Sequence, residues 1–75
     1  MENIIDMNSD EIKHLPFALR AHYRAASNFI RRAQEKENTR EMCFKSAIYH
    51  LEKVDDTERI ILVIQLANSL GIGIS

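Results

Sequence analysis

The chain has 75 residues and a net charge of −1, and 45% of its residues are hydrophobic while 28% are charged. A domain of this size buries only about 60% of the surface of its unfolded chain, so small domains often need a disulfide, a metal or a second subunit. Cys43 is the single cysteine, which excludes an internal disulfide and a zinc site built from cysteine pairs. The composition therefore predicts a globular domain that gains stability by oligomerisation.

The first helix signal follows a short acidic segment at the N-terminus. Ser9 precedes two acidic residues, a pattern typical of a helix start, because serine caps free N–H groups and acidic side chains favour the positive helix end. Pro16 disfavours helical geometry at the residue before it and suits the first turn of a new helix. These signals predict a short turn or helix at residues 9–14 and a long helix at about residues 16–36.

The long predicted helix separates an alanine-rich apolar face from a basic edge, at about 100° per residue. The apolar face consists of Ala18, Leu19, His22, Ala25, Ala26, Phe29, Ile30 and Ala33. The basic edge consists of Arg20, Arg24, Ser27 and Arg31, and Lys13 extends it. Arginine presents fixed pairs of donors that suit carboxylates and phosphates. We expect this edge to contact an acidic protein partner, with a nucleic-acid backbone or plain solvent as the alternatives.

A second helix is predicted at about residues 40–53, with Thr39 as its N-cap. Its apolar stripe consists of Cys43, Phe44, Ala47, Leu51 and Val54. Met42 and Tyr49 lie on the other side of this helix, seven residues apart. They are candidate contacts for a partner, although single exposed apolar side chains are common.

A third helix is predicted at about residues 57–70, because Asp55 or Asp56 suits an N-cap and Gly71 suits a left-handed stop. Its polar positions include a narrow strip of Glu58, Gln65 and Ser69. A helix that is apolar on nearly all sides is usually buried, and two neighbours in a short chain cover only part of it. We therefore predict self-association through Ile60, Val63, Leu66, Ala67 and Leu70.

The predicted fold is all-α: a small antiparallel three-helix bundle, preceded by a short N-terminal turn or helix and completed by oligomerisation. The three helices are expected at about residues 16–36, 40–53 and 57–70. A single helical domain at residues 9–75 is predicted to follow a flexible acidic arm at residues 1–8, in which Ile4, Ile5 and Met7 could dock on the domain.

The sequence shows no pattern of catalytic or metal-binding residues. It lacks paired carboxylates, a glycine-rich phosphate loop and a nucleophile elbow. His14, His22 and His50 do not have the i, i+4 spacing that places two ligands on one helix face. We expect neither enzymatic activity nor a metal or cofactor.

The predicted location is the cytoplasm. Acidic residues stand where a signal peptide would be basic, and a lone thiol fits a reducing compartment. The apolar run at residues 60–70 is far shorter than the ~20 residues that cross a bilayer. We expect no membrane association.

The predicted function is that of a non-enzymatic protein–protein interaction or regulatory protein. It would act as a homo-oligomer, with a dimer as the first expectation, through its apolar C-terminal helix, and would offer the basic edge to an acidic partner. One alternative is a nucleic-acid-binding regulator that uses the basic edge, although the pI near 6.3 is far below the value above about 9 that marks such domains. Another alternative is a secretion or assembly chaperone subunit.

Residues 65–72 resemble the first half of a helix-turn-helix, with an alanine followed by Leu-Gly-Ile at the turn. No recognition helix follows before Ser75, so we do not expect this segment to read DNA. The same residues are explained by an apolar helix that ends at a glycine.

Overall fold

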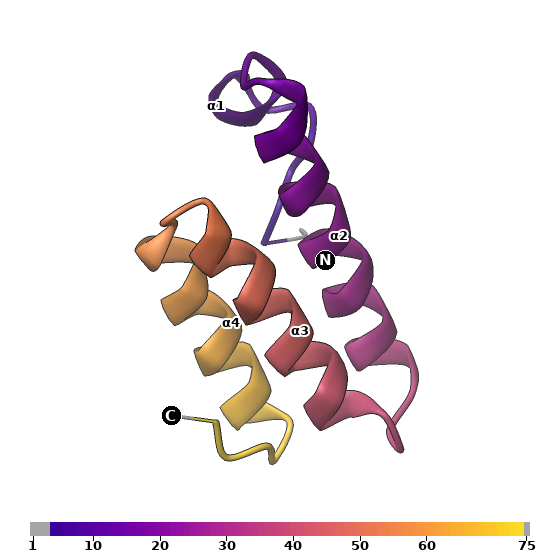
Figure 1. The fold of residues 1–75 in the computed structure, drawn as a ribbon. Helices are drawn as coiled ribbons and strands as arrows, with labels where there is room; N and C mark the ends of the chain where they lie inside the picture. The colour runs from indigo at the N-terminus through magenta and orange to yellow at the C-terminus, as the bar shows by residue number, and fades with distance from the viewer. Residues whose placement is uncertain (1–3, 75) are drawn as a thin grey trace.

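The structure, a computed structural model, describes residues 4–74 and is helical throughout its regular elements (Figure 1). Over that range the helices are α1 (Asp10–Lys13), α2 (Phe17–Glu35), α3 (Arg40–Lys53) and α4 (Thr57–Ser69). The prediction of an all-α fold is confirmed, and the three long helices begin and end within a few residues of the predicted positions. None of the helices in residues 4–74 is long and apolar enough to cross a membrane.

Local signals define both ends of α4, as the sequence predicts. At its start, the Asp56 carboxylate accepts a hydrogen bond from the Arg59 backbone N–H at 3.0 Å. At its end, Gly71 adopts a φ of +86°, a backbone conformation that side chains rarely tolerate. The Ile72 N–H then donates to the Ala67 carbonyl at 2.9 Å, which closes the helix in a Schellman motif.

Two of the predicted N-caps do not form. Neither Ser9 before α1 nor Thr39 before α3 makes a capping hydrogen bond through its side chain. The Thr39 hydroxyl instead lies 3.9 Å from the Cys43 thiol, which donates to it. Both helices start on backbone bonds, from the Lys13 N–H to the Ser9 carbonyl and from the Cys43 N–H to the Thr39 carbonyl, each at 2.9 Å.

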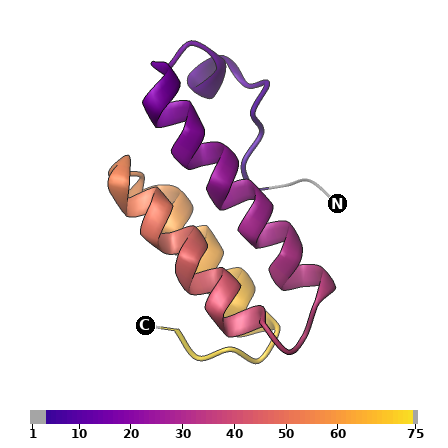
Figure 2. The same ribbon diagram turned by 45° about the vertical axis from the view of Figure 1, so that its right-hand side comes forward.

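The three long helices run in alternating directions, and α3 packs against both α2 and α4 (Figures 1 and 2). One core joins all the helices, including the single-turn α1. Its largest fully buried side chains are Ile12, Ile30, Phe44, Leu51 and Val63. Because each such side chain contributes about 1.5–3 kcal/mol when it is removed from water, this small core holds the chain together.

The segment before α1 packs against this core through the three apolar residues that were expected to be able to dock. Ile5 is only 2% exposed, and Ile4 and Met7 are partly buried against the same core. The segment runs alongside α2 on its way to α1 (Figure 2). Residues 1–3 of the predicted arm lie outside the described residues. The apolar side chains of the arm outweigh its acidic character in deciding where it lies.

The buried face of α2 is rotated from the predicted one. Tyr23 is buried, and so is Ser27, which the sequence placed on the basic edge. Ala18, predicted to face the core, is exposed. The hydrogen bond to Asp56 makes the burial of the Tyr23 hydroxyl favourable.

Candidate functional site

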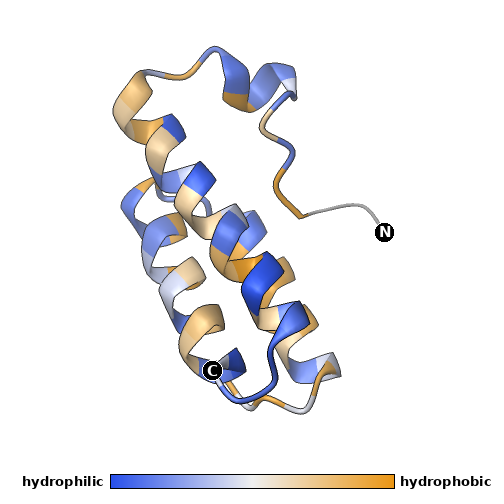
Figure 3. Ribbon diagram, turned by 90° about the vertical axis from the view of Figure 1, so that its right-hand side faces the viewer, coloured by the Kyte–Doolittle hydropathy of each residue, from blue (hydrophilic) through white to orange (hydrophobic). Residues whose placement is uncertain are grey.

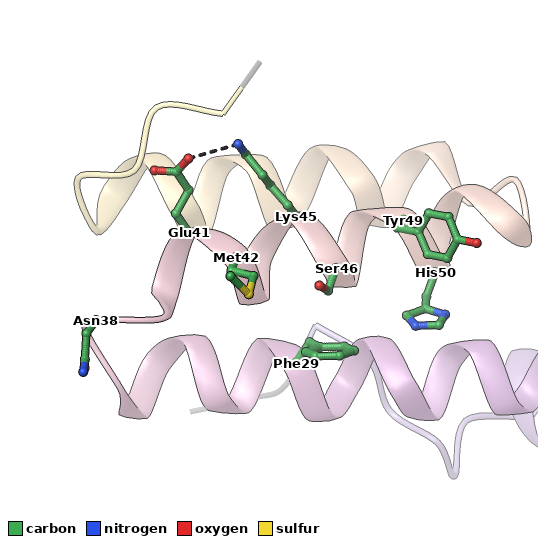
Figure 4. A pocket seen from close by; sticks show the side chains of 8 residues that line it. All are labelled: Phe29, Asn38, Glu41, Met42, Lys45, Ser46, Tyr49 and His50. Carbon is green, nitrogen blue, oxygen red and sulfur yellow. Dashed lines mark ion pairs between the residues drawn. The ribbon is translucent and has the colours of Figure 1, made fainter.

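A groove with a volume of about 590 Å³ lies between α2 and α3 (Figure 4). On α3 it is lined by Met42 and Tyr49, which are 70% and 53% exposed. Phe29 of α2 lies on the opposite side. The structure therefore brings Met42 and Tyr49, the predicted exposed contacts, onto one groove that both helices form.

Two histidines join α2 to α3 beside this groove. The Nδ1 atoms of His22 and His50 lie 3.0 Å apart, so one ring donates a hydrogen bond and the other accepts it. The Phe29 ring stacks on His50 with centroids 5.9 Å apart, and the Tyr49 ring meets it edge-on at 5.3 Å. Burial and the neighbouring His22 lower the pKa of His50, which favours its neutral form. The cluster thus links the two helices through a hydrogen bond between the two rings and the stacking of Phe29 on His50.

Charged side chains of α3 border the groove. Lys45 pairs with Glu41 at 3.0 Å, and both side chains are largely exposed. The Lys53 ammonium lies 4.9 Å from the centre of the Tyr49 ring, which is a cation–π contact. Among the described residues, Lys53 has no acidic partner. The groove therefore combines exposed apolar surface with a cation whose charge is not paired.

A second, smaller hollow of about 260 Å³ lies on the outer side of α2. Arg20 and Arg24 line it together with Phe17, which is 82% exposed. Neither guanidinium is paired with an acid within residues 4–74. Figure 3 faces α2 and shows hydrophilic segments recurring along it. Phe17 was missed in the sequence, because a single aromatic residue outside the apolar face of the helix belongs to no periodic pattern.

The remaining members of the predicted basic edge do not share one surface. Arg31 is exposed and donates to the Asn28 side chain at 3.0 Å. Lys13 belongs to α1 and pairs with Asp10 at 3.1 Å, and Ser27 is buried. We define the basic face of α2 as Arg20, Arg24 and Arg31.

The residues predicted for self-association on α4 are divided between core and surface. Val63 and Ala67 are fully buried, Ile60 and Leu66 are partly buried against the core, and Leu70 is 37% exposed. Val63 and Ala67 are therefore unavailable to a second copy, because the packing of the subunit already covers them. The large apolar side chains that α4 exposes are Ile61 and Leu62, and Leu70 follows the helix.

A polar network that the sequence did not predict ties α4 to α2 and α1. The Tyr23 hydroxyl donates to the Asp56 carboxylate at 2.6 Å, and the Arg59 side chain donates to the same carboxylate at 2.6 Å. Arg59 also pairs with Glu11 of α1, and its guanidinium lies 5.6 Å from the centre of the Tyr23 ring. The side chains of Asp56 and Arg59 are only 9% and 16% exposed. The one signal in the sequence was the expected cap at Asp56.

The pKa values in this network favour the charge states that hold it together. Burial alone would raise the pKa of Asp56, but the hydrogen bonds from Tyr23 and Arg59 outweigh it and lower that pKa. Burial and the bond to Asp56 raise the pKa of Tyr23 to about 12. Burial alone would lower the pKa of Arg59, but its bonds to Glu11 and Asp56 raise it. An ionised carboxylate, a neutral phenol and a charged guanidinium form a structural cluster.

No family model, curated protein or solved structure matches this chain. Residues 4–74 contain no group of three or more His, Cys, Asp or Glu side chains that could hold a metal ion. Cys43 is buried. We therefore base the functional proposal on the α2–α3 groove and on the basic face of α2.

Proposed function

We propose that this chain is a small non-enzymatic interaction protein that binds an acidic segment of a partner protein on the basic face of α2. The observation that carries this proposal is the exposed Phe17 beside Arg20 and Arg24, around one hollow. Aromatic and arginine side chains are enriched at protein interfaces. A partner segment that offers both carboxylates and an apolar side chain fits this combination.

An acidic protein fits the basic face better than a nucleic acid does. Arginine binds carboxylates and phosphates in the same bidentate way, so the residue type does not discriminate between them. Nucleic-acid binding relies on neutralising many phosphates, and domains that do so have a pI above about 9. This chain has a pI near 6.3, which leaves the three arginines as a local feature.

We further propose that the protein acts as a homo-oligomer, with a dimer as the simplest state. Large exposed apolar side chains support this: Met42 and Tyr49 on the groove, and Ile61 and Leu62 on α4. Apolar surface that stays exposed on a small domain marks interaction sites. The burial of Val63 reduces the support for a chaperone whose whole third helix is covered by a different protein.

Fluorescence anisotropy with a labelled peptide tests the basic face. The peptide carries glutamates along one side of a helix and leucines along the other, and binding is measured at low salt. We expect the double variant Arg20→Gln, Arg24→Gln to bind at least about tenfold more weakly, because one hydrogen bond to a charged group is worth about 1.5–3 kcal/mol and 1.4 kcal/mol is tenfold.

The matched control removes the same amount of charge elsewhere. Arg32→Gln with Lys36→Gln changes two exposed cations at the other end of α2 and is expected to leave peptide affinity nearly unchanged. Equal weakening by both double variants would contradict a site at the basic face. DNA and RNA oligonucleotides run in the same assay, and tighter binding of either, with a steep loss in salt, would favour the nucleic-acid alternative.

A further inference from the structure

We infer that the α2–α3 groove is a two-fold interface between two copies of this chain, in which α3 packs antiparallel against α3 of the second copy. This inference rests on the proposed homo-oligomer and names the surface that forms it. It replaces α4, the helix predicted from sequence, with the helix that carries Met42 and Tyr49. The spacing of those two residues, their exposure and the charges around them point to the same arrangement.

The spacing of Met42 and Tyr49 is self-complementary. They are seven residues apart on α3, which is two helical turns or about 10.5 Å along the axis. A two-fold axis between positions 45 and 46 places Met42 of one copy against Tyr49 of the other, and does so twice. Such an interface, in which one patch meets itself, is the commonest kind in homo-oligomers.

The groove offers room and suitable surface for the incoming side chains. Its volume is about 590 Å³, and the Phe29 and His50 rings stack beside it. Met42 and Tyr49 are 70% and 53% exposed, so most of Met42 and about half of Tyr49 stay available to a second copy. A methionine sulfur packs favourably on an aromatic ring, and the dimer would contain this contact twice.

The charges are also self-complementary. In the antiparallel arrangement, Glu41 faces position 50 of the second copy, one helical turn from its Lys53. Lys53 has no acidic partner within residues 4–74, and a second copy supplies one. Lys45 lies next to the axis and bonds to Glu41 at 3.0 Å, so this carboxylate would lie between Lys45 of its own copy and Lys53 of the other.

The other exposed surfaces fit a second copy less well. On α4, Ile61 and Leu62 are separated around the helix by the polar strip of Glu58, Gln65 and Ser69. On α2, a two-fold contact would bring arginines against arginines, and like charges facing each other oppose binding. Among these three faces within residues 4–74, the face of α3 joins exposed apolar side chains to charges of both signs.

Disulfide trapping tests the arrangement. Cys43 is replaced by alanine in every protein, and Met42→Cys and Tyr49→Cys are made separately. A disulfide requires Cα atoms roughly 4.4–6.8 Å apart. Two copies of position 42 would lie about 10.5 Å apart along the axis, whereas positions 42 and 49 of different copies would face each other. We expect a disulfide-linked dimer when the two variants are mixed, and none from either variant alone.

Light scattering of the unmodified chain separates the possible failures. An 8.7 kDa monomer at every concentration overturns both the proposed homo-oligomer and this interface. An oligomer without the mixed disulfide overturns the interface alone. Trapping of Met42→Cys with Ile61→Cys would instead assign the groove to α4 of a second copy. Trapping of Met42→Cys with itself would indicate a parallel arrangement and would also overturn the inference.

A charge exchange provides a second measurement that does not depend on cysteine chemistry. Lys53→Glu should shift the monomer–dimer midpoint to higher concentration, because it places like charges across the interface. Adding Glu41→Lys to the same chain should restore dimerisation, at least in part. If the double variant is weaker than the single variant, Glu41 and Lys53 do not meet across the interface and the proposed register is wrong.

Discussion

Two regions of this small protein join side chains from different helices, and they differ in how completely their charges are paired. In the Asp56 network, the Asp56 carboxylate accepts bonds from Tyr23 and Arg59, and Arg59 also binds Glu11. In the α2–α3 groove, Tyr49 is more than half exposed and Lys53 has no acidic partner among residues 4–74. A buried network with every charge paired stabilises a subunit. Unpaired charge beside exposed apolar surface is a feature of a binding face.

The largest expected effect separates these regions by stability. Asp56→Ala leaves the Tyr23 hydroxyl and part of the Arg59 charge without a partner and removes the cap of α4. We expect it to lower the free energy of unfolding by about 2–5 kcal/mol, because a lost N-cap costs about 0.5–2 kcal/mol and donors left without a partner cost about 1–3 kcal/mol. Met42→Ala, on the groove, is expected to change it by no more than about 0.5 kcal/mol. Urea denaturation at low protein concentration measures both, and similar losses would contradict the contrast.

An intermediate effect is expected from the two tyrosines. Tyr23→Phe removes the hydroxyl that donates to the Asp56 carboxylate and should cost about 1.5–3 kcal/mol, since the acceptor is charged and buried. Tyr49→Phe makes the same chemical change on the exposed groove and should be nearly neutral. Thermal melts of the two variants beside the unmodified chain measure the difference. An equal shift in Tm for both would mean that the Asp56 network does not depend on the Tyr23 hydroxyl.

The smallest effect concerns the His22–His50 pair and depends on pH. The pKa of His50 is lowered in the folded state, so the unfolded chain takes up a proton at this ring more readily. The contribution to stability is therefore present above the ordinary value of 6.5 and is lost as the pH falls below it. We expect a lower urea midpoint at about pH 5 than at about pH 7.5, and a smaller difference in His50→Gln.

His14→Gln is the matched control for that measurement, because His14 is exposed. It should keep the full difference between the two pH values. If His50→Gln and His14→Gln behave alike, the acid sensitivity arises elsewhere in the chain. The groups that face His50 are the His22 ring from α2, the Phe29 ring and the Tyr49 ring.

The sequence predicts where the helices of this protein begin and end better than it predicts which side of each helix is buried. The cap at Asp56 and the stop at Gly71 were predicted and are confirmed. The side of α4 that packs against α3 was not predicted. The helix is apolar on almost every side, so the arrangement of its residues around the axis does not show where α3 lies. For α2, the apolar periodicity left Tyr23 and Ser27 outside the predicted buried face, whereas both side chains are buried and Tyr23 bonds to Asp56.

The sequence predicted some residues of the two candidate surfaces and missed others. Met42 and Tyr49 stand out in the sequence because they share one side of a helix whose other side is apolar. Their common groove needs Phe29, which lies on a different helix. The basic face of α2 was recognised from the spacing of its arginines. The exposed Phe17 within it was not, because a single aromatic residue near a helix start has no periodic pattern.

The sequence by itself determined the all-α class, the positions of the three long helices and the ends of α4, because those features depend on contacts within a few residues of the chain. Only the tertiary structure decided that Tyr23, Asp56, Arg59 and Glu11 meet, and that His22 faces His50. These partners are far apart along the chain, and no local spacing encodes their approach. Packing of α3 between α2 and α4 brings them together, and the same packing leaves Met42 and Tyr49 exposed.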